Sequence, residues 1–146
     1  MNIFVTVGNT GFDDLIRYID LLETEFTVIM QISNEAQYIP NNHRYFEFTD
    51  DIEQYYTAAD IVVTHAGAGS IYRLLELNKR IIIVPNMSRI DSHQMDIADY
   101  MDRNKFALVC RDIHQLGDMI ETINSSDIRP YVHDSFFKCD EIISLI

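Results

Sequence analysis

Residues 62–94, VVTHAGAGSIYRLLELNKRIIIVPNMSRIDSHQ, decide how this chain folds. A β-branched run leads into a glycine-containing turn, a short amphipathic segment follows, and a second apolar run ends at Pro85. This order predicts a strand, a helix and a second, parallel strand. The glycine turn and the polar residues after Pro85 then lie at the carboxyl edge of the sheet, where open α/β sheets bind their ligands.

The same alternation of short apolar runs and helical spacing extends along the rest of the chain. We expect a Rossmann-like open parallel sheet with helices on both faces, formed by a single domain over residues 1–146. Thr49 is a plausible N-cap for the second helix, and Met95, Ala98 and Met101 are expected to be buried by the fourth. The apolar tail predicts a terminal helix over residues 136–146. The predicted strands are residues 2–7, 26–31, 44–48, 60–64, 80–84 and 106–110, and the other helices are residues 13–22, 51–58, 70–77, 92–103 and 113–123.

Length and charge exclude several classes of protein. The chain has 146 residues, enough for one ordinary domain, and its net charge of -12 repels nucleic acid and anionic lipid. Cys110 and Cys139 lack metal-type spacing, so reduced thiols are expected. The strand-like start does not resemble a signal peptide, and no apolar run approaches the roughly 18 residues of a membrane span. We therefore expect a cytoplasmic protein without a transmembrane segment.

Two glycine turns are candidates for binding phosphate. One of them, called the second glycine turn because it comes later in the chain, is residues 65–70, His65-Ala-Gly-Ala-Gly-Ser70. Its residues Gly67, Ala68, Gly69 and Ser70 are small and offer backbone N–H groups at the start of a helix. The first glycine turn, residues 8–11, begins with Gly8 and would open on the same edge, where Asn9 and Thr10 are possible donors. Neither the dinucleotide GxGxxG nor the P-loop motif is present. The alternative is that the glycines only make tight turns.

A polar cluster, Asn86, Asp91, His93 and Gln94, follows the next strand. Amide, carboxylate and imidazole groups bind sugar hydroxyls by donating and accepting hydrogen bonds. With the glycine turns, they indicate a nucleotide-sugar pocket. Alternatively, Asn86 is a turn residue and Asp91 with Ser92 caps a helix. His65, Asp91 and His93 lack further ligands at metal-type spacing, and Ser70 lacks the GxSxG context of a hydrolase nucleophile, so we expect neither a metal site nor a Ser-His-Asp triad.

These segments together resemble the C-terminal, donor-binding domain of MurG-type glycosyltransferases, glycosyltransferase family 28, and most closely its stand-alone members, the small subunits of split transferases (the PssE type). Residues 4–15 resemble the family's opening VTVGTTxFDxLI, residues 59–70 its AD…HAGAGS segment, and residues 84–94 its VPN…DxHQ segment. The resemblance covers nearly the whole chain. Arg73 stands where the family often has an acidic residue for the ribose, and Leu77-Asn78-Lys79-Arg80 replaces the usual Leu-Gly-Lys-Pro.

The resemblance implies one half of a GT-B enzyme, metal-independent and inverting, that uses a UDP-sugar as donor and needs no cofactor. It implies that Asn9, Thr10 and residues 67–70 face the diphosphate, that the base-side loop, residues 46–50, borders the uracil, and that His93 and Gln94 reach the donor sugar. His65 is a candidate catalytic base. Alternatively, it anchors the turn by hydrogen bonding.

One domain supplies one wall of a two-domain cleft, so a partner is implied. By the resemblance, the partner is a membrane-anchored, acceptor-binding glycosyltransferase subunit (the PssD type) that recruits the chain to the cytoplasmic face of the membrane. The acceptor is then a polyprenyl-diphosphate-linked saccharide in capsule, exopolysaccharide or lipid-linked oligosaccharide synthesis. The competing hypothesis is a non-catalytic nucleotide-binding or interaction module whose glycine loop is structural.

Overall fold

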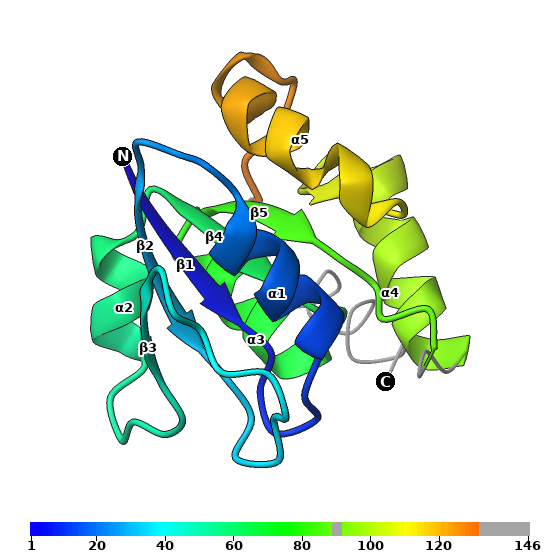
Figure 1. The fold of residues 1–146 in the computed structure, drawn as a ribbon. Helices are drawn as coiled ribbons and strands as arrows, with labels where there is room; N and C mark the ends of the chain where they lie inside the picture. Colours follow the sequence, from blue (N-terminus) through cyan, green and yellow to red (C-terminus); the bar gives the residue numbers. More distant parts are fainter. Residues whose placement is uncertain (89–91, 132–146) are drawn as a thin grey trace.

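The computed structural model describes residues 1–88 and 92–131, and their strands form a single parallel sheet (Figure 1). A helix follows every strand except β2, which a loop connects to β3. The strands are β1 (Asn2–Thr6), β2 (Thr27–Gln31), β3 (Arg44–Phe46), β4 (Ile61–Thr64), β5 (Arg80–Ile83) and β6 (Leu108–Val109). The helices are α1 (Asp13–Leu21), α2 (Glu53–Ala58), α3 (Ala68–Glu76), α4 (Ser92–Arg103) and α5 (Leu116–Thr122), the last flanked by 3-10 turns at Ile113–Gln115 and Ile123–Ser125.

The strand order is β3-β2-β1-β4-β5-β6. The chain therefore builds outward from β1 in one direction, returns, and builds outward from β4 in the other. The central strands β1 and β4 pair in register, with Thr6 opposite Thr64. In such sheets the crevice at the carboxyl ends of the two central strands is the usual place for a ligand. The predicted Rossmann-like open parallel sheet is confirmed.

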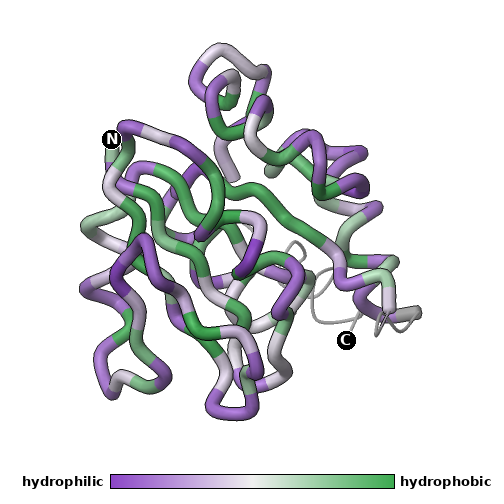
Figure 2. The backbone as a smooth tube through the Cα atoms, viewed as in Figure 1, coloured by the Kyte–Doolittle hydropathy of each residue, from purple (hydrophilic) through white to green (hydrophobic). Residues whose placement is uncertain are grey.

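Helices cover both faces of the sheet and divide the core in two. On one face, α1 and α5 bury apolar side chains such as Leu15 and Leu116 against Val5 and Val63. On the other face, α2, α3 and α4 bury Tyr56, Leu74 and Met101 against alternate residues of the same strands. The strands are accordingly the most apolar part of the tube in Figure 2, whereas the loops at the carboxyl edge, at the bottom of this view, are largely hydrophilic.

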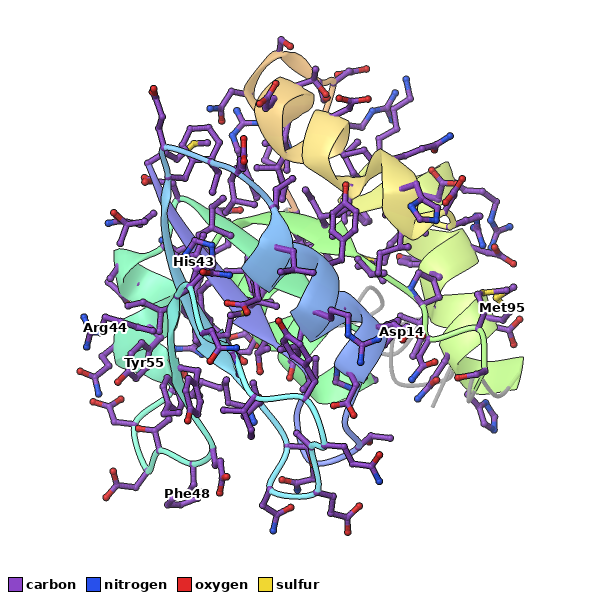
Figure 3. The ribbon with its side chains drawn as sticks, viewed as in Figure 1. Asp14, His43, Arg44, Phe48, Tyr55 and Met95 are labelled. Carbon is purple, nitrogen blue, oxygen red and sulfur yellow. The ribbon has the colours of Figure 1, made fainter. Side chains whose placement is uncertain are left out.

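Three local expectations are corrected by the structure. The second helix begins at Glu53 with Ile52 as its N-cap, so the prediction of Thr49 as the cap was wrong. Thr49 instead accepts a hydrogen bond from the Asp51 N–H at 3.1 Å, a local side-chain turn that competes with helix. Met95 is only partly buried and lies at the periphery in Figure 3, because Ile97 takes the position against the sheet. The third and sixth strands are shorter than expected.

Some expectations fall on residues outside the described part of the chain, namely the terminal helix over residues 136–146, Asp91 and Cys139. Cys110 is described and is a buried free thiol whose Sγ donates to the Asp112 carbonyl at 3.0 Å. Burial raises its pKa to about 11. Within the described residues no helix has the length and apolar character that crossing a membrane requires.

Candidate functional site

The two glycine turns lie side by side at the carboxyl edge, because each follows one of the two central strands. The first glycine turn leaves β1 and leads to α1, and the second leaves β4 and leads to α3 (Figure 1). Gly8 and Gly11 have φ of +62° and +69°, which L side chains rarely adopt. Both glycines are therefore needed for the path of the first turn. The sequence-based prediction that these turns share one edge is confirmed.

The imidazole of His65 occupies the space between the two turns. A Cβ added at Gly8 would lie 3.3 Å from Cε1 of His65, and one added at Gly67 would lie 2.9 Å from its Nε2. Real Cβ atoms essentially never come as close as 2.9 Å to another heavy atom. Gly67 is thus required by the protein's own imidazole, independently of any ligand.

His65 is mostly buried, and burial lowers the pKa of its imidazole, an effect that the backbone of Thr6 partly offsets. The ring is therefore neutral at pH 7. Its Nδ1 and the neighbouring Thr64 Oγ1 are buried and have no hydrogen-bond partner among the described residues. His65 packs against Gly8 and Gly67. Both roles considered from the sequence, a catalytic base and an anchor that holds the turn by hydrogen bonding, remain predictions.

The start of α3 presents unpaired backbone donors. The first helical hydrogen bond runs from the Ile71 N–H to the Gly67 carbonyl at 3.1 Å, and no side chain caps the helix. Within the described part of the chain, the N–H groups of Ala68, Gly69 and Ser70 have no acceptor. N–H groups without an acceptor among the described residues, together with the positive end of the helix dipole, are suited to bind an anion such as a diphosphate.

Gly69 and Ser70 differ in what they contribute to this helix start. Gly69 is exposed, and a Cβ added there would meet nothing within 4 Å, so the protein itself does not require glycine at this position. The Ser70 hydroxyl shares a hydrogen bond with the buried Tyr56 hydroxyl. Ser70 therefore fastens α3 to α2, and its backbone N–H rather than its hydroxyl is the free donor.

Gln31, at the end of β2, is a residue of the site that sequence analysis missed. It is buried, and its side-chain amide contacts the first glycine turn and the backbone that follows β3. Ser33, two residues further on, donates from its hydroxyl to the Asn9 carbonyl at 3.0 Å. The signal in the sequence is a glutamine that closes an apolar strand, where a neutral polar residue needs buried partners.

Asn86 and Thr10 border a hollow of about 280 Å³ between the start of α1 and the connections that follow β2 and β5. Asn86 Oδ1 accepts from the Ser88 hydroxyl at 2.8 Å and from its N–H at 3.3 Å, as expected for a turn residue. Asp13 Oδ1 is buried and has no partner among the described residues. Hydroxyl, amide and carboxylate groups thus line a space beside the glycine turns.

His93 and Gln94 lie in the first turn of α4, on the same face of the sheet as α3. His93 is exposed and Gln94 is half-buried. Asp91, the third member of the predicted sugar-binding set, lies outside the described residues. Nowhere in the described ranges do three or more His, Cys, Asp or Glu side chains gather as metal ligands would.

Arg73, which departs from the family pattern, is held by two carboxylates. Its guanidinium donates to both oxygens of Glu53 on α2, the longer contact measuring 2.9 Å, and to Glu76 one turn further along α3 at 3.0 Å. Hydrogen bonds from Arg73 keep the pKa of the Glu53 carboxyl below its ordinary value. Arg73 thus connects α2 to α3 next to the second glycine turn.

The base-side loop, residues 46–50, extends from β3 at the same edge. The ring of Phe46 packs against that of Tyr55 in a tilted arrangement, with centroids 4.6 Å apart, and this contact fixes the start of the loop. Phe48 is 82% exposed and points away from the body of the protein in Figure 3. A flat, exposed ring of this kind is suited to contact a nucleobase.

The fold is that of a doubly wound α/β domain, and the start of α3 lies at its topological switch point. Residues 2–132 match the glycosyltransferase family 28 C-terminal domain, so the chain belongs to this family. It is 36% identical over 72 residues to the UDP-N-acetylglucosamine transferase subunit ALG13 of Yarrowia lipolytica, an alignment that covers 49% of this chain and 37% of the relative. It is 30% identical over 123 residues to the human protein of the same name, covering 74% of this chain and 11% of the relative.

Two solved structures have the same fold. The NMR structure of ALG13 superposes with a TM-score of 0.64 at 21% identity, covering 97% of this chain and 94% of that one. The crystal structure of Acinetobacter baumannii MurG superposes with a TM-score of 0.65 at 20% identity, covering 84% of this chain and 41% of MurG. At these identities the likeness shows the fold alone. The alignments cover between 10% and 48% of the length of the ALG13 relatives from Yarrowia lipolytica, human, mouse and Debaryomyces hansenii.

Proposed function

We propose that this chain is the donor-binding and catalytic subunit of a UDP-sugar-dependent glycosyltransferase, with UDP-N-acetylglucosamine as the donor. Membership of glycosyltransferase family 28 supports the reaction class. The donor and the need for a second subunit come from the names of the relatives, each a UDP-N-acetylglucosamine transferase subunit.

The observation that carries the proposal is the set of free backbone donors at the start of α3, next to the first glycine turn. The chain has a net charge of -12, so a phosphate gains nothing from the overall electrostatic field. Fixed N–H groups and a helix dipole act at short range and bind a diphosphate without a lysine. The exposed Gly69 leaves room for the diphosphate to approach the backbone.

The rest of the donor extends to the two sides of this diphosphate site. Uracil lies along the base-side loop, where Phe48 offers an exposed ring. The N-acetylglucosamine ring lies on the opposite side, toward the hollow bordered by Thr10 and Asn86 and toward His93 and Gln94. Asp13 Oδ1, buried without a partner among the described residues, is a ready acceptor for a sugar hydroxyl at the wall of this hollow.

The acceptor site belongs to a second protein. A single domain forms one wall of the cleft, so a donor bound to this chain alone is exposed to water and faces no nucleophile. We propose a membrane-anchored, acceptor-binding partner of the PssD type, which brings the chain to the cytoplasmic face of the membrane. The acceptor is a polyprenyl-diphosphate-linked saccharide, and assays with defined acceptors separate capsule, exopolysaccharide and lipid-linked oligosaccharide synthesis.

His65 is our candidate for a general base within this chain. Burial keeps its imidazole neutral at pH 7, which is the form that a base requires, and Nε2 lies at the second glycine turn. The reaction we propose is inverting and proceeds without a metal ion. If the base is instead supplied by the partner, His65→Gln lowers donor affinity and leaves the pH dependence of kcat unchanged.

Calorimetric titration with UDP tests the proposal, with Gly69→Ala as the matched variant. The new methyl group meets no atom of the protein, so the fold is preserved while the approach of a diphosphate to the backbone is blocked. We expect the wild type to bind UDP and the variant to bind it roughly tenfold or more weakly, at equal thermal stability. Absence of binding to UDP or any other nucleotide supports the competing hypothesis of an interaction module. Efficient sugar transfer by the isolated chain would contradict the need for a partner.

A further inference from the structure

We propose that Gln31 is a positioning residue that holds the first glycine turn and the base-side loop in a fixed relation, so that a nucleoside diphosphate can engage both at once. The inference rests on the proposed function, because it assigns the diphosphate to the first of these segments and the base to the second. Gln31 itself is 6% exposed and does not need to touch the ligand.

The side-chain oxygen of Gln31 fixes the first glycine turn. Oε1 accepts from the Thr6 hydroxyl at 2.6 Å and from the Gly8 N–H at 2.9 Å. Thr6 is the last residue of β1, and Gly8 is the residue whose φ of +62° begins the turn. The carbonyl of Gly8 is held as well, since it accepts from Nε2 of Gln31 at 3.1 Å.

The side-chain nitrogen of Gln31 extends the contact to the base-side loop. Nε2 also lies 2.8 Å from the carbonyl of Ile32 and 3.2 Å from that of Glu47, so its two N–H groups are shared among three carbonyl oxygens. Glu47 is the second residue of the base-side loop and directly precedes the exposed Phe48. One primary amide therefore links backbone groups of the segments that follow β1, β2 and β3.

Removal of this amide takes a hydrogen-bond partner from three partly buried backbone groups. The Gly8 N–H and the carbonyls of Gly8 and Glu47 each lose a hydrogen bond, and no other side chain of the described residues replaces it. A partly buried polar group that loses its protein partner is satisfied by water instead, so each segment shifts toward solvent. Because β2 lies between β1 and β3, the two segments shift independently once Gln31 is gone.

Independent movement weakens a ligand that spans both segments more than a ligand that contacts one. A linked ligand gains from the fixed separation of its two subsites, whereas a fragment needs only its own subsite. The affinity for UDP therefore depends on the separation that Gln31 maintains, whereas the affinities for uridine and for pyrophosphate do not. A purely structural role for Gln31 would lower global stability and change all three affinities in proportion.

The test measures the binding of UDP, uridine and inorganic pyrophosphate to the full chain and to Gln31→Met and Gln31→Glu. Methionine keeps the shape and removes every hydrogen bond, whereas glutamate keeps the acceptor for Gly8 and loses the donor to Glu47. Asp20→Asn is the matched control, because Asp20 is also buried and holds residues 38–42 by hydrogen bonds, but at the opposite edge of the sheet. The melting temperature of each variant is measured, so that binding is compared only at temperatures where all of them are folded.

We expect both Gln31 variants to bind UDP roughly five- to tenfold more weakly, and to bind uridine and pyrophosphate within about twofold of the wild type. Asp20→Asn is expected to leave all three affinities unchanged. Unaltered UDP affinity in Gln31→Met, or an equal loss for UDP and both fragments, would overturn the inference.

Amide hydrogen exchange and carbonyl chemical shifts separate this inference from the proposed function. If the wild type binds no UDP, the proposed function fails, and these two measurements on the free protein decide whether Gln31 holds the two segments. Faster exchange of the Gly8 N–H and a changed carbonyl chemical shift of Glu47 in Gln31→Met, with the rest of the sheet unchanged, support the positioning role. An unchanged value of either quantity overturns it.

Discussion

Gly67 and His65 are so close that a Cβ on Gly67 would lie 2.9 Å from Nε2 of the imidazole. The glycine two residues further on, Gly69, has no such neighbour within 4 Å. The two glycines of the second turn therefore serve different needs. Gly67 allows the chain to pack against its own side chain, and Gly69 leaves the backbone open to a ligand.

Replacement of Gly67 tests this division. Gly67→Ala forces the imidazole out of its position between the turns and is expected to lower the free energy of unfolding by about 2 kcal/mol, as overpacking does. Gly69→Ala is expected to leave it unchanged or to raise it by up to about 1 kcal/mol, because alanine is the better helix former. Urea denaturation measures both. In the double variant Gly67→Ala, His65→Ala the imidazole is absent, so this variant should be more stable than Gly67→Ala alone. Equal losses of stability in Gly67→Ala and Gly69→Ala would contradict the assignment.

Stability should depend on the protonation of His65. Burial lowers the pKa of the folded imidazole below that of the unfolded chain, so the unfolded state takes up the proton first as the pH falls. The free energy of unfolding is therefore expected to decrease from about pH 6.5 downward, until the folded-state pKa is passed. In His65→Gln this group is absent, so the free energy of unfolding should lack this part of its decrease with falling pH. Parallel curves for the wild type and His65→Gln between about pH 6.5 and 5 would show that the ring is not buried as described.

Asp20 contributes in a lower pH window. Burial alone would raise the pKa of this carboxyl, but hydrogen bonds from the Tyr38 hydroxyl and the N–H groups of Asn41 and Asn42 outweigh burial and lower it. Its contribution to stability is present above the unfolded-state pKa and is lost as the pH falls through the lower, folded-state value. We expect Asp20→Asn to be less stable than the wild type at pH 7 by about 1–2 kcal/mol and to lose less stability than the wild type below about pH 4. Acid titration followed by circular dichroism checks this, and an identical acid limb in the two proteins would count against it.

Arg73 should act on the contact between α2 and α3 and not on the ligand. Its guanidinium is engaged by Glu53 and Glu76, so Arg73→Ala leaves two carboxylates facing each other. We expect a lower melting temperature, most pronounced at low salt, and unchanged UDP affinity. The exchange variant Glu53→Arg, Arg73→Glu restores the pair and should recover the melting temperature. A loss of UDP affinity in Arg73→Ala at unchanged stability would mean that the guanidinium contacts the nucleotide.

The sequence was sufficient to predict what depends on local pattern. Apolar runs placed the six strands, and the glycine turns after residues 7 and 64 fell at one edge because parallel strands share a direction. The same reasoning could not show Gln31 as part of the site, since its partners Gly8 and Glu47 are 23 and 16 residues away. Tertiary contacts of this kind leave no periodicity in the sequence.

Other differences have the same origin. The hydrogen bond between the Ser70 hydroxyl and Tyr56 on α2 could not be predicted from the sequence, because the two residues belong to different helices. Helical spacing favoured Met95 as a core residue, but Ile97 is the buried residue of this turn of α4 and Met95 is only partly buried. The departure at position 73 was visible in the sequence, but its partner Glu53 lies 20 residues away on α2.

The central claim is that the amide groups at the start of α3 and in the first glycine turn bind the diphosphate of a UDP-sugar. Titration of the isotopically labelled chain with UDP, followed through its backbone amide resonances, tests this most directly. We expect the largest shifts at Ala68, Gly69 and Ser70 and at Gly8 to Thr10, and smaller shifts at these positions in Gly69→Ala at the same, sub-saturating UDP concentration. Shifts confined to other parts of the chain, or no shifts at saturating UDP, would contradict it.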